Sequence, residues 1–235
     1  MHAFRFDDLA STEPGSFFRL DSREESHLFR ILRARPGETV ALLDGHGATG
    51  TAVVEPDRRL RLESKRTVPP PSRRLHLYFA PPKKQKLDAL LKQAVELGVF
   101  ELVPVLCERS VVQPGESSVA GRWVDLLFEA CKQSGNPFLP AVASPMPFAA
   151  ALARARGSCD ALVVGSNRTG VFPDLGTASD AAFFVGPEGG FTDAETEAMF
   201  AAGAVPLRIG DWTLRVETAA VAGLGVLNVL MNRGA

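Results

Sequence analysis

Three consecutive prolines, Pro69–Pro71, divide the chain into two segments of different pattern. Such a run cannot continue a helix or a central strand, and it favours an extended backbone. Short segments with alternating apolar residues come before it. After it, apolar strands alternate with longer amphipathic stretches. The sequence therefore predicts two domains, residues 1–70 and residues 73–235.

The first domain is predicted to be a small β-barrel with one helix. Strands are expected at residues 39–43, 48–54 and 60–63. The pair Asp44-Gly45 stands between the first two, and Asp-Gly between apolar runs is a strong hairpin signal. The helix is expected at residues 21–33, with Asp21 or Ser22 as its N-cap.

The second domain is predicted to be an α/β fold. Strands are expected at residues 75–80, 102–106, 161–165, 182–185 and 205–209, and helices at residues 83–97, 121–133, 192–202 and 218–231. Thr192 and Glu195 have the spacing of a capping box at one helix start. Repeated alternation of strand and helix indicates a parallel sheet with helices on both faces.

The charge balance is more informative by segment than for the whole chain. The net charge is −1 over 235 residues, which does not indicate a polyanionic partner. Residues 1–74 nevertheless carry 13 Lys and Arg against 11 Asp and Glu, and most of these cations are arginines. Arginine suits phosphate recognition because its donors form a planar fork. A solvated basic face without a ligand fits the same pattern.

Cysteines and histidines give no sign of a disulfide framework or a metal site. The three cysteines contain no Cys-x-x-Cys pair, and the four histidines lack ligand spacing. The N-terminus has no apolar signal core, and the longest apolar run, Ala219–Leu227, is too short to span a bilayer. We expect a soluble cytoplasmic protein that needs no metal.

Two loops at predicted strand ends carry residues that packing alone does not explain. The first, Gly186–Gly190, supplies backbone N–H groups and one carboxylate, Glu188. It lacks the Gly-Lys-Ser/Thr ending of a phosphate loop, and no Gly-x-Gly-x-x-Gly follows any strand. The second places Arg215 and Glu217 before a helix rich in Ala and Gly. A tight turn and a structural ion pair are the alternative interpretations of the two loops.

These blocks, taken in order, resemble one family. Gly186-Pro187-Glu188-Gly189-Gly190-Phe191, followed by Leu214-Arg215-Val216-Glu217-Thr218-Ala219, is similar to the RsmE family of small-subunit ribosomal RNA uridine N3-methyltransferases, in the SPOUT superfamily. Further similar blocks begin at His27, Lys86, Glu108 and Gln133. Each block is weak alone, but in this order they cover nearly the whole chain.

The resemblance implies an N-terminal PUA-like barrel that binds RNA, a C-terminal domain with a trefoil knot, S-adenosylmethionine as cofactor, and a homodimer. The implied cofactor-binding residues are Leu162, Val164, Gly165, Val185, Gly186, Pro187, Glu188, Gly189, Gly190, Ile209, Gly210, Leu214, Arg215, Thr218 and Ala219. Among the expected catalytic residues, Arg215 orients the base or stabilises charge, and Glu217 holds Arg215. Glu188 faces the sulfonium or acts as base. Arg23, Arg30 and Arg33 are the expected RNA contacts.

Two positions differ from the usual family pattern. Asn136 stands where the family commonly has Arg, so an RNA contact there would pass to Arg109 or Arg168. Val216 stands where Thr is usual. Two alternative functions remain open: methylation of another RNA acceptor, such as a ribose 2′-hydroxyl or a tRNA base, and RNA binding without catalysis during ribosome assembly.

Overall fold

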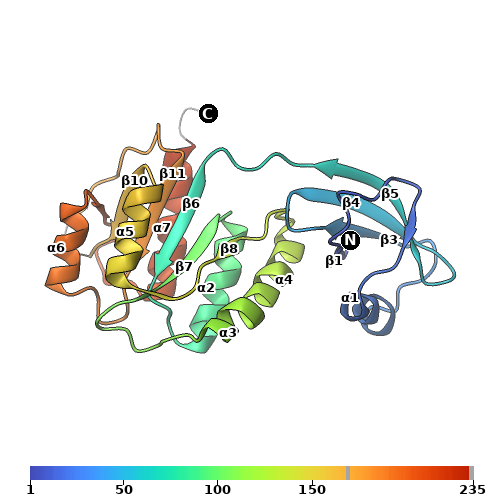
Figure 1. Ribbon diagram of the computed structural model, residues 1–235, viewed down its shortest axis with the longest axis horizontal. Coiled ribbons are helices and arrows are strands. Elements are labelled where there is room, and N and C mark those ends of the chain that lie inside the picture. The colour runs from blue at the N-terminus through green and yellow to red at the C-terminus, as the bar shows by residue number, and fades with distance from the viewer. Residues whose placement is uncertain (168–169, 233–235) are drawn as a thin grey trace. The chain divides into compact units, whose positions relative to one another are not determined.

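The computed structural model describes residues 1–167 and 170–232 (Figure 1). The chain forms two compact units. Unit 1 consists of Met1–Pro70 together with Phe128–Leu139, and unit 2 consists of Pro71–Leu127 and Pro140–Ala235. A segment that follows the prolines by more than fifty residues thus belongs with the N-terminal residues.

Unit 1 contains a five-stranded sheet in the order β1-β3-β4-β5-β2. Its strands are β1 (Ala3–Arg5), β2 (Phe17–Phe18), β3 (Thr39–Leu43), β4 (Ala48–Val54) and β5 (Leu60–Thr67). Only β1 and β3 pair in parallel. The small β-barrel predicted from sequence is therefore confirmed in part. The described residues form a half-barrel sheet, in which β1 and β2 stand at opposite edges and β2 is only two residues long.

The predicted hairpin and helix of unit 1 are confirmed, and the helix changes type along its length. Asp44 Oδ1 accepts hydrogen bonds from the backbone N–H groups of His46 (2.7 Å) and Ala48 (3.0 Å), which closes the turn between β3 and β4. Helix α1 (Ser22–Ser26) has Asp21 as its N-cap, and it continues as the π-helix η1 (His27–Ile31).

A buried ion pair joins α1 to the later segment of unit 1. Helix α4 (Val124–Ser134) supplies Lys132, whose Nζ lies 2.9 Å from Glu24 Oε1 and 2.8 Å from Glu129 Oε1. Glu24 is 5% exposed and Lys132 is 8% exposed. Because an unpaired buried charge is costly, the buried Glu24 depends on Lys132, which pairs with Glu129 as well.

Unit 2 contains the parallel sheet, which confirms the predicted α/β class. The strand order is β12-β10-β11-β6-β7-β8, and β9 also pairs with β7. The strands are β6 (Arg74–Phe79), β7 (Glu101–Leu106), β8 (Ala141–Val142), β9 (Met146–Pro147), β10 (Ala161–Gly165), β11 (Asp180–Val185) and β12 (Val205–Leu207). Every pairing in this sheet is parallel.

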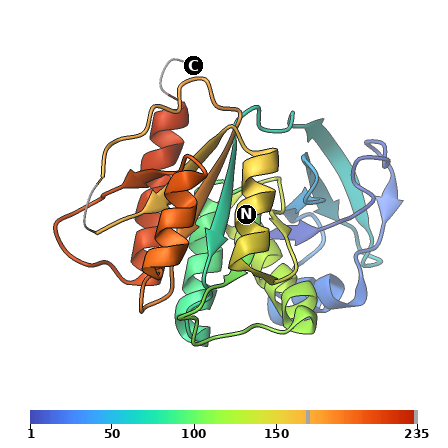
Figure 2. The same ribbon diagram turned by 60° about the vertical axis from the view of Figure 1, so that its left-hand side comes forward.

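Helices cover both faces of this sheet (Figure 2). Unit 2 has α2 (Lys84–Glu96), α3 (Glu116–Ser118), the π-helix η2 (Val119–Trp123), the start of α4, α5 (Phe148–Ser158), α6 (Asp193–Ala201) and α7 (Val216–Met231). Helices α5 and α6 pack on one face, and α2 and α7 on the other. No helix of the described residues is long and apolar enough to cross a membrane.

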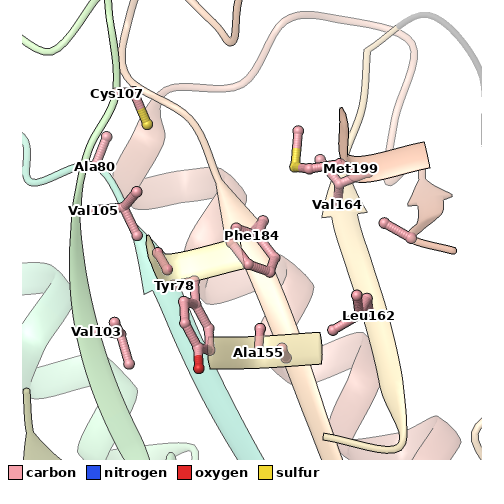
Figure 3. Packing of buried hydrophobic residues seen from close by; sticks show 13 residues of the cluster. Tyr78, Ala80, Val103, Val105, Cys107, Ala155, Leu162, Val164, Phe184 and Met199 are labelled. Atoms are coloured by element: carbon pink, nitrogen blue, oxygen red, sulfur yellow. The ribbon is translucent and has the colours of Figure 1, made fainter. Parts of the chain in front are cut away.

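The core beneath α5 and α6 is built on two stacked rings. Tyr78 of β6 and Phe184 of β11 have ring centroids 4.7 Å apart, and Leu162, Val164 and Met199 surround them (Figure 3). On the other face, Gly223 of α7 lies against Phe183, where a Cβ would stand 2.2 Å from the ring. The absence of a side chain at Gly223 therefore has a packing reason.

A network of charged side chains occupies the starts of the central strands. His76 Nδ1 lies 3.0 Å from Glu101 Oε2, and His76 Nε2 lies 2.8 Å from Asp180 Oδ1. Arg74 and Arg154 each approach one of these carboxylates to 2.5 Å. Burial favours the neutral ring, but the hydrogen bonds to Glu101 and Asp180 outweigh it and raise the pKa of His76.

Candidate active site

A pocket of about 580 Å³ lies beyond the C-terminal ends of β10, β11 and β12. Its walls come from the segments that follow these strands, together with the start of α7. Ligands of open α/β sheets bind at this end of the strands, where loops from neighbouring strands converge. Both loops singled out in the sequence line this one pocket.

The loop after β11 is shaped by two of its own contacts. The N–H of Gly190 donates to the carbonyl of Pro187 at 2.8 Å, and Gly190 has a φ of 70° that favours glycine. The ring of Phe191 packs so closely on Gly186 that a Cβ there would lie 3.0 Å from it. The predicted capping box of Thr192 and Glu195 follows and begins α6.

The loop that follows β7 forms hydrogen bonds with the loop that follows β11. Arg109 Nη1 donates to the carbonyl oxygens of Gly189 (3.0 Å) and Phe191 (3.4 Å). The buried Glu195 accepts from the N–H of Glu108 through Oε1 (3.0 Å) and from that of Thr192 through Oε2 (2.9 Å). These bonds hold the second half of the pocket loop, from Gly189 to Thr192.

Arg215 and Glu217 do not pair with each other as the sequence suggests. Arg215 is the N-cap residue of α7, is exposed and lines the pocket. Glu217 follows two residues later, in the first turn of the helix, where its Oε1 lies 3.5 Å from Lys86 Nζ of α2. Its Oε2 is buried and has no hydrogen-bond partner in the described part of the chain. The side chain of Glu217 therefore lies beside Lys86, and within the described residues it forms no hydrogen bond or ion pair with Arg215.

The structure brings most of the predicted cofactor residues to the pocket and places three elsewhere. Those that line it are Gly165, Val185, Gly186, Pro187, Glu188, Gly189, Gly190, Ile209, Gly210, Leu214, Arg215 and Ala219. Leu162 and Val164 instead point into the core beneath α5 (Figure 3). Thr218 is an exposed residue of α7 outside the lining.

Sequence reasoning missed other parts of the lining. Asn167 follows β10 and donates to Thr213 Oγ1 at 3.2 Å, which links two pocket segments across 46 residues. Phe200 of α6 and Trp212 are exposed aromatic side chains at the pocket. Tryptophan is seldom this exposed. The position of Trp212 in the sequence, between a predicted strand and a predicted helix, was a signal that could have pointed to it.

The lining suits a ligand recognised through backbone groups. Gly190 and Gly210 both line the pocket, and a Cβ on either would meet nothing within 4 Å. A ligand can therefore approach the backbone closely at these two points. Glu188 and Arg215 are exposed there, and within the described residues neither shows an ion pair.

The predicted RNA contacts lie in unit 1 and differ in their surroundings. Arg23 reaches Glu129 at 3.9 Å, whereas Arg30 and Arg33 are exposed and form no ion pair with any described residue. Arg19 and Arg61 pair with Glu25 and Glu55. Part of the N-terminal arginine content is thus already neutralised by neighbouring carboxylates.

The two positions that differ from the family pattern have local roles. Asn136 Oδ1 accepts from the N–H of Phe138 at 3.0 Å and so shapes the turn after α4. Val216 is 4% exposed and packs in the core. Of the two substitutes expected for an arginine at position 136, Arg109 lines the pocket, and Arg168 lies outside the described residues.

None of the three cysteines lines this pocket. Burial raises the pKa of Cys107 and Cys131 to about 12 and that of Cys159 to about 11, so these thiols stay protonated. No group of three or more His, Cys, Asp or Glu residues in the described ranges could hold a metal ion.

Known proteins match the chain over most or all of its length. A family model of the RNA methyltransferase domain matches residues 69–228. The ribosomal RNA small subunit methyltransferase E of Mycobacterium tuberculosis is 30% identical over 243 residues, covering 98% of this chain and 92% of that protein. Its counterpart from Synechocystis sp. is 28% identical, covering 90% and 73%.

Solved structures agree with this match. A ribosomal RNA small subunit methyltransferase E from Neisseria gonorrhoeae, bound to S-adenosyl methionine, has a TM-score of 0.86 and 27% identity, and the match covers 100% of both chains. A methyltransferase from Legionella pneumophila in complex with SAM gives 0.84 and 25%, over 97% of this chain and 96% of that one. The chain therefore belongs to the ribosomal RNA small subunit methyltransferase E family and carries its RNA methyltransferase domain.

Proposed function

We propose that the protein transfers the methyl group of S-adenosylmethionine to N3 of a specific uridine in small-subunit ribosomal RNA. The observation that carries the proposal is the pocket at the ends of β10, β11 and β12, in a chain of this family. Twelve residues expected from sequence to hold the cofactor line it. Two of its glycines leave room for close approach to the backbone.

The residues present fit S-adenosylmethionine without any charged clamp. The adenine edge would be read by backbone groups of the Gly186–Gly190 loop and of the segment around Gly210. Arg109 and Glu195 keep the first of these loops in place. When bound, the cofactor supplies an electrophilic methyl group. The protein therefore has to align the acceptor nitrogen with that methyl group and remove the proton on the nitrogen.

We assign Arg215 to the acceptor side of the reaction. Removal of the N3 proton leaves negative charge on the uracil oxygens, and a guanidinium directed at them stabilises that charge. Arg215 is exposed at the pocket, where it can meet an incoming base. Glu217 supports it indirectly, since its contact with Lys86 ties the start of α7 to α2.

Glu188 is the carboxylate of the Gly186–Gly190 loop, and we assign it the role of proton acceptor or sulfonium partner. It is exposed and lines the pocket. A general base must come within hydrogen-bond reach of the proton that it removes. Glu188→Gln keeps the shape of the side chain and removes its basicity, so it separates this role from a role in packing.

RNA binding is proposed for residues 1–70 as a PUA-like domain, and catalysis for residues 73–235 as a SPOUT domain with a trefoil knot. Arg23, Arg30 and Arg33 would contact phosphates, which fix position without reading sequence. The return of α7 to pack on α2, β6 and β11, after the chain has formed β12 at the sheet edge, is compatible with a knot. A ribosomal substrate would place the enzyme in the cytoplasm.

A homodimer is proposed through the uncovered side of α7. Ala222 and Gly225 are partly exposed there, and Val229 is 60% exposed. Small and apolar residues on an open helix face allow another helix to approach closely. Sedimentation of the protein, and of a Val229→Asp variant that places a charge on this face, would test the proposal.

The function is tested by transfer of labelled methyl groups from S-adenosylmethionine to small ribosomal subunits that lack N3-methyluridine. We expect N3-methyluridine as the labelled nucleoside, identified by mass. Label on another nucleoside or on a ribose would show that the acceptor is a different group, while methyl transfer from S-adenosylmethionine would still hold. No binding of S-adenosylmethionine in calorimetry would remove the enzymatic function and leave RNA binding alone.

A further inference from the structure

One large aromatic side chain at the pocket is not explained by packing. Trp212 is 84% exposed, whereas the other tryptophan, Trp123, is 2% exposed in the core. Tryptophan is usually buried to a large extent, so a side chain left this open in a pocket wall is informative. Trp212 lies between β12 and α7 and belongs to the pocket lining.

The loop that carries Trp212 is held on both sides of it. Arg208 Nε donates to the carbonyl of Gly210 at 3.2 Å, and Arg208 Nη2 lies 2.8 Å from Asp211 Oδ1. On the other side, Thr213 Oγ1 accepts from Asn167 Nδ2 at 3.2 Å. The indole is therefore presented to solvent by a loop with polar anchors, rather than left open because the loop lacks contacts.

We propose that Trp212 is a stacking platform for an unpaired base of the RNA substrate, either the acceptor uracil or the base next to it. This inference rests on the proposed function. Proteins that read single-stranded RNA stack splayed bases on exposed aromatic side chains. Arg215 lies three residues further along the chain and lines the same pocket, so a stacked base would have a cation beside it.

The surroundings of Trp212 favour a base over a second copy of the protein. Its neighbours Asp211 and Thr213 are both exposed and polar, and Arg208 is exposed as well. An interface between copies would bury these groups with the indole, at a cost in desolvation. A nucleobase covers only the ring face and leaves the polar neighbours in water. The apolar side of α7 is better suited to another copy.

The test compares the wild type with Trp212→Phe and Trp212→Ala in methyl transfer to small subunits. Loss of one base stack raises the KM for the subunit by about 5- to 100-fold in Trp212→Ala. Trp212→Phe keeps a flat ring and loses much less. The dissociation constant for S-adenosylmethionine and the sedimentation coefficient stay at wild-type values in both variants.

Three results would overturn the inference. They are an unchanged KM in Trp212→Ala, an equal loss of S-adenosylmethionine affinity, and a change of oligomeric state. The second would make Trp212 part of the cofactor site, and the third would make it an interface residue.

Emission of Trp212 provides a test that does not depend on turnover. A uridine-containing single-stranded RNA should quench the solvent-exposed indole of the wild type and leave Trp123, the tryptophan that remains in Trp212→Ala, unaffected. If the wild type transfers no methyl group, the proposed function fails, but quenching and a weaker RNA affinity of Trp212→Ala still support the platform. Absence of both effects removes it.

Discussion

The two ends of the parallel sheet in unit 2 carry their charges in opposite ways. At the strand starts, His76, Glu101 and Asp180 are largely buried, and each has at least one partner of opposite charge. At the strand ends, Glu188 and Arg215 are exposed and form no ion pair with any described residue. Charges that partners already neutralise contribute to stability, whereas charges left open at a pocket are available to a ligand.

The largest effect on turnover is expected at the strand ends, where the charged side chains are exposed at the pocket. Arg215→Ala should lower kcat by about 100- to 1000-fold, because loss of one donor to a developing oxyanion has that size. Arg215 is exposed at a helix start, so the melting temperature and the affinity for S-adenosylmethionine should hardly change. The matched control is Arg154→Ala, which removes an arginine that pairs with Glu101 at the strand starts. Near wild-type turnover in Arg215→Ala would remove Arg215 from the mechanism.

At the strand starts, we expect substitution of His76 to cause a loss of stability that depends on pH. The pKa of His76 is raised above 6.5 by its two carboxylate partners, so its contribution is complete below pH 6.5 and is lost as the pH rises through the folded-state pKa. His76→Gln should therefore lower the free energy of unfolding by about 1–2 kcal/mol near pH 6, and by less at alkaline pH.

Urea unfolding of the wild type and His76→Gln at several pH values measures this difference. The pKa of Glu101, despite the opposing effect of burial, is lowered by the hydrogen bond to His76 and by Arg154. Its contribution is present above pH 4.5 and is lost as the pH falls through the folded-state value. A stability difference that stays constant with pH would show that His76 acts by packing alone. Methyl transfer should be unchanged.

The smallest effect is expected for Arg109, because its guanidinium supports the pocket loop through hydrogen bonds. Arg109→Ala loses two hydrogen bonds to loop carbonyls and should raise the dissociation constant for S-adenosylmethionine about three- to tenfold. Arg109→Lys should be intermediate. If Arg109 instead contacts RNA, the cofactor affinity stays constant and the salt dependence of RNA binding becomes shallower.

Features that depend on neighbours in sequence could be predicted, and those that depend on distant partners could not. The capping box of Thr192 and Glu195 and the Asp44-Gly45 turn are set by residues within a few positions, and both are found. Lys86 is the partner of Glu217 across 131 positions, and no local pattern names it. The sequence therefore anticipated the position of Arg215 at the pocket, but not the contact of Glu217 with Lys86.

The same distinction explains the errors in fold. Helix α5 was not predicted, because its Ala- and Arg-rich sequence buries only Ala151 and Ala155 and so shows no wide apolar stripe. The continuous apolar run of β10 marked Leu162 and Val164 as strand residues but did not tell which face of the sheet they occupy. The prolines marked a boundary, yet the grouping of Phe128–Leu139 with unit 1 depends on long-range contacts.

The pair of Glu24 and Lys132 sets an order for events during synthesis. Unit 1 draws on residues up to Leu139, so a nascent chain that has released only its first seventy residues holds Glu24 without its cation. Loss of one partner of a buried pair costs about 3–5 kcal/mol. The N-terminal unit should therefore complete its fold on the ribosome only after β6 and β7, the first two strands of the parallel sheet, have emerged from the exit tunnel.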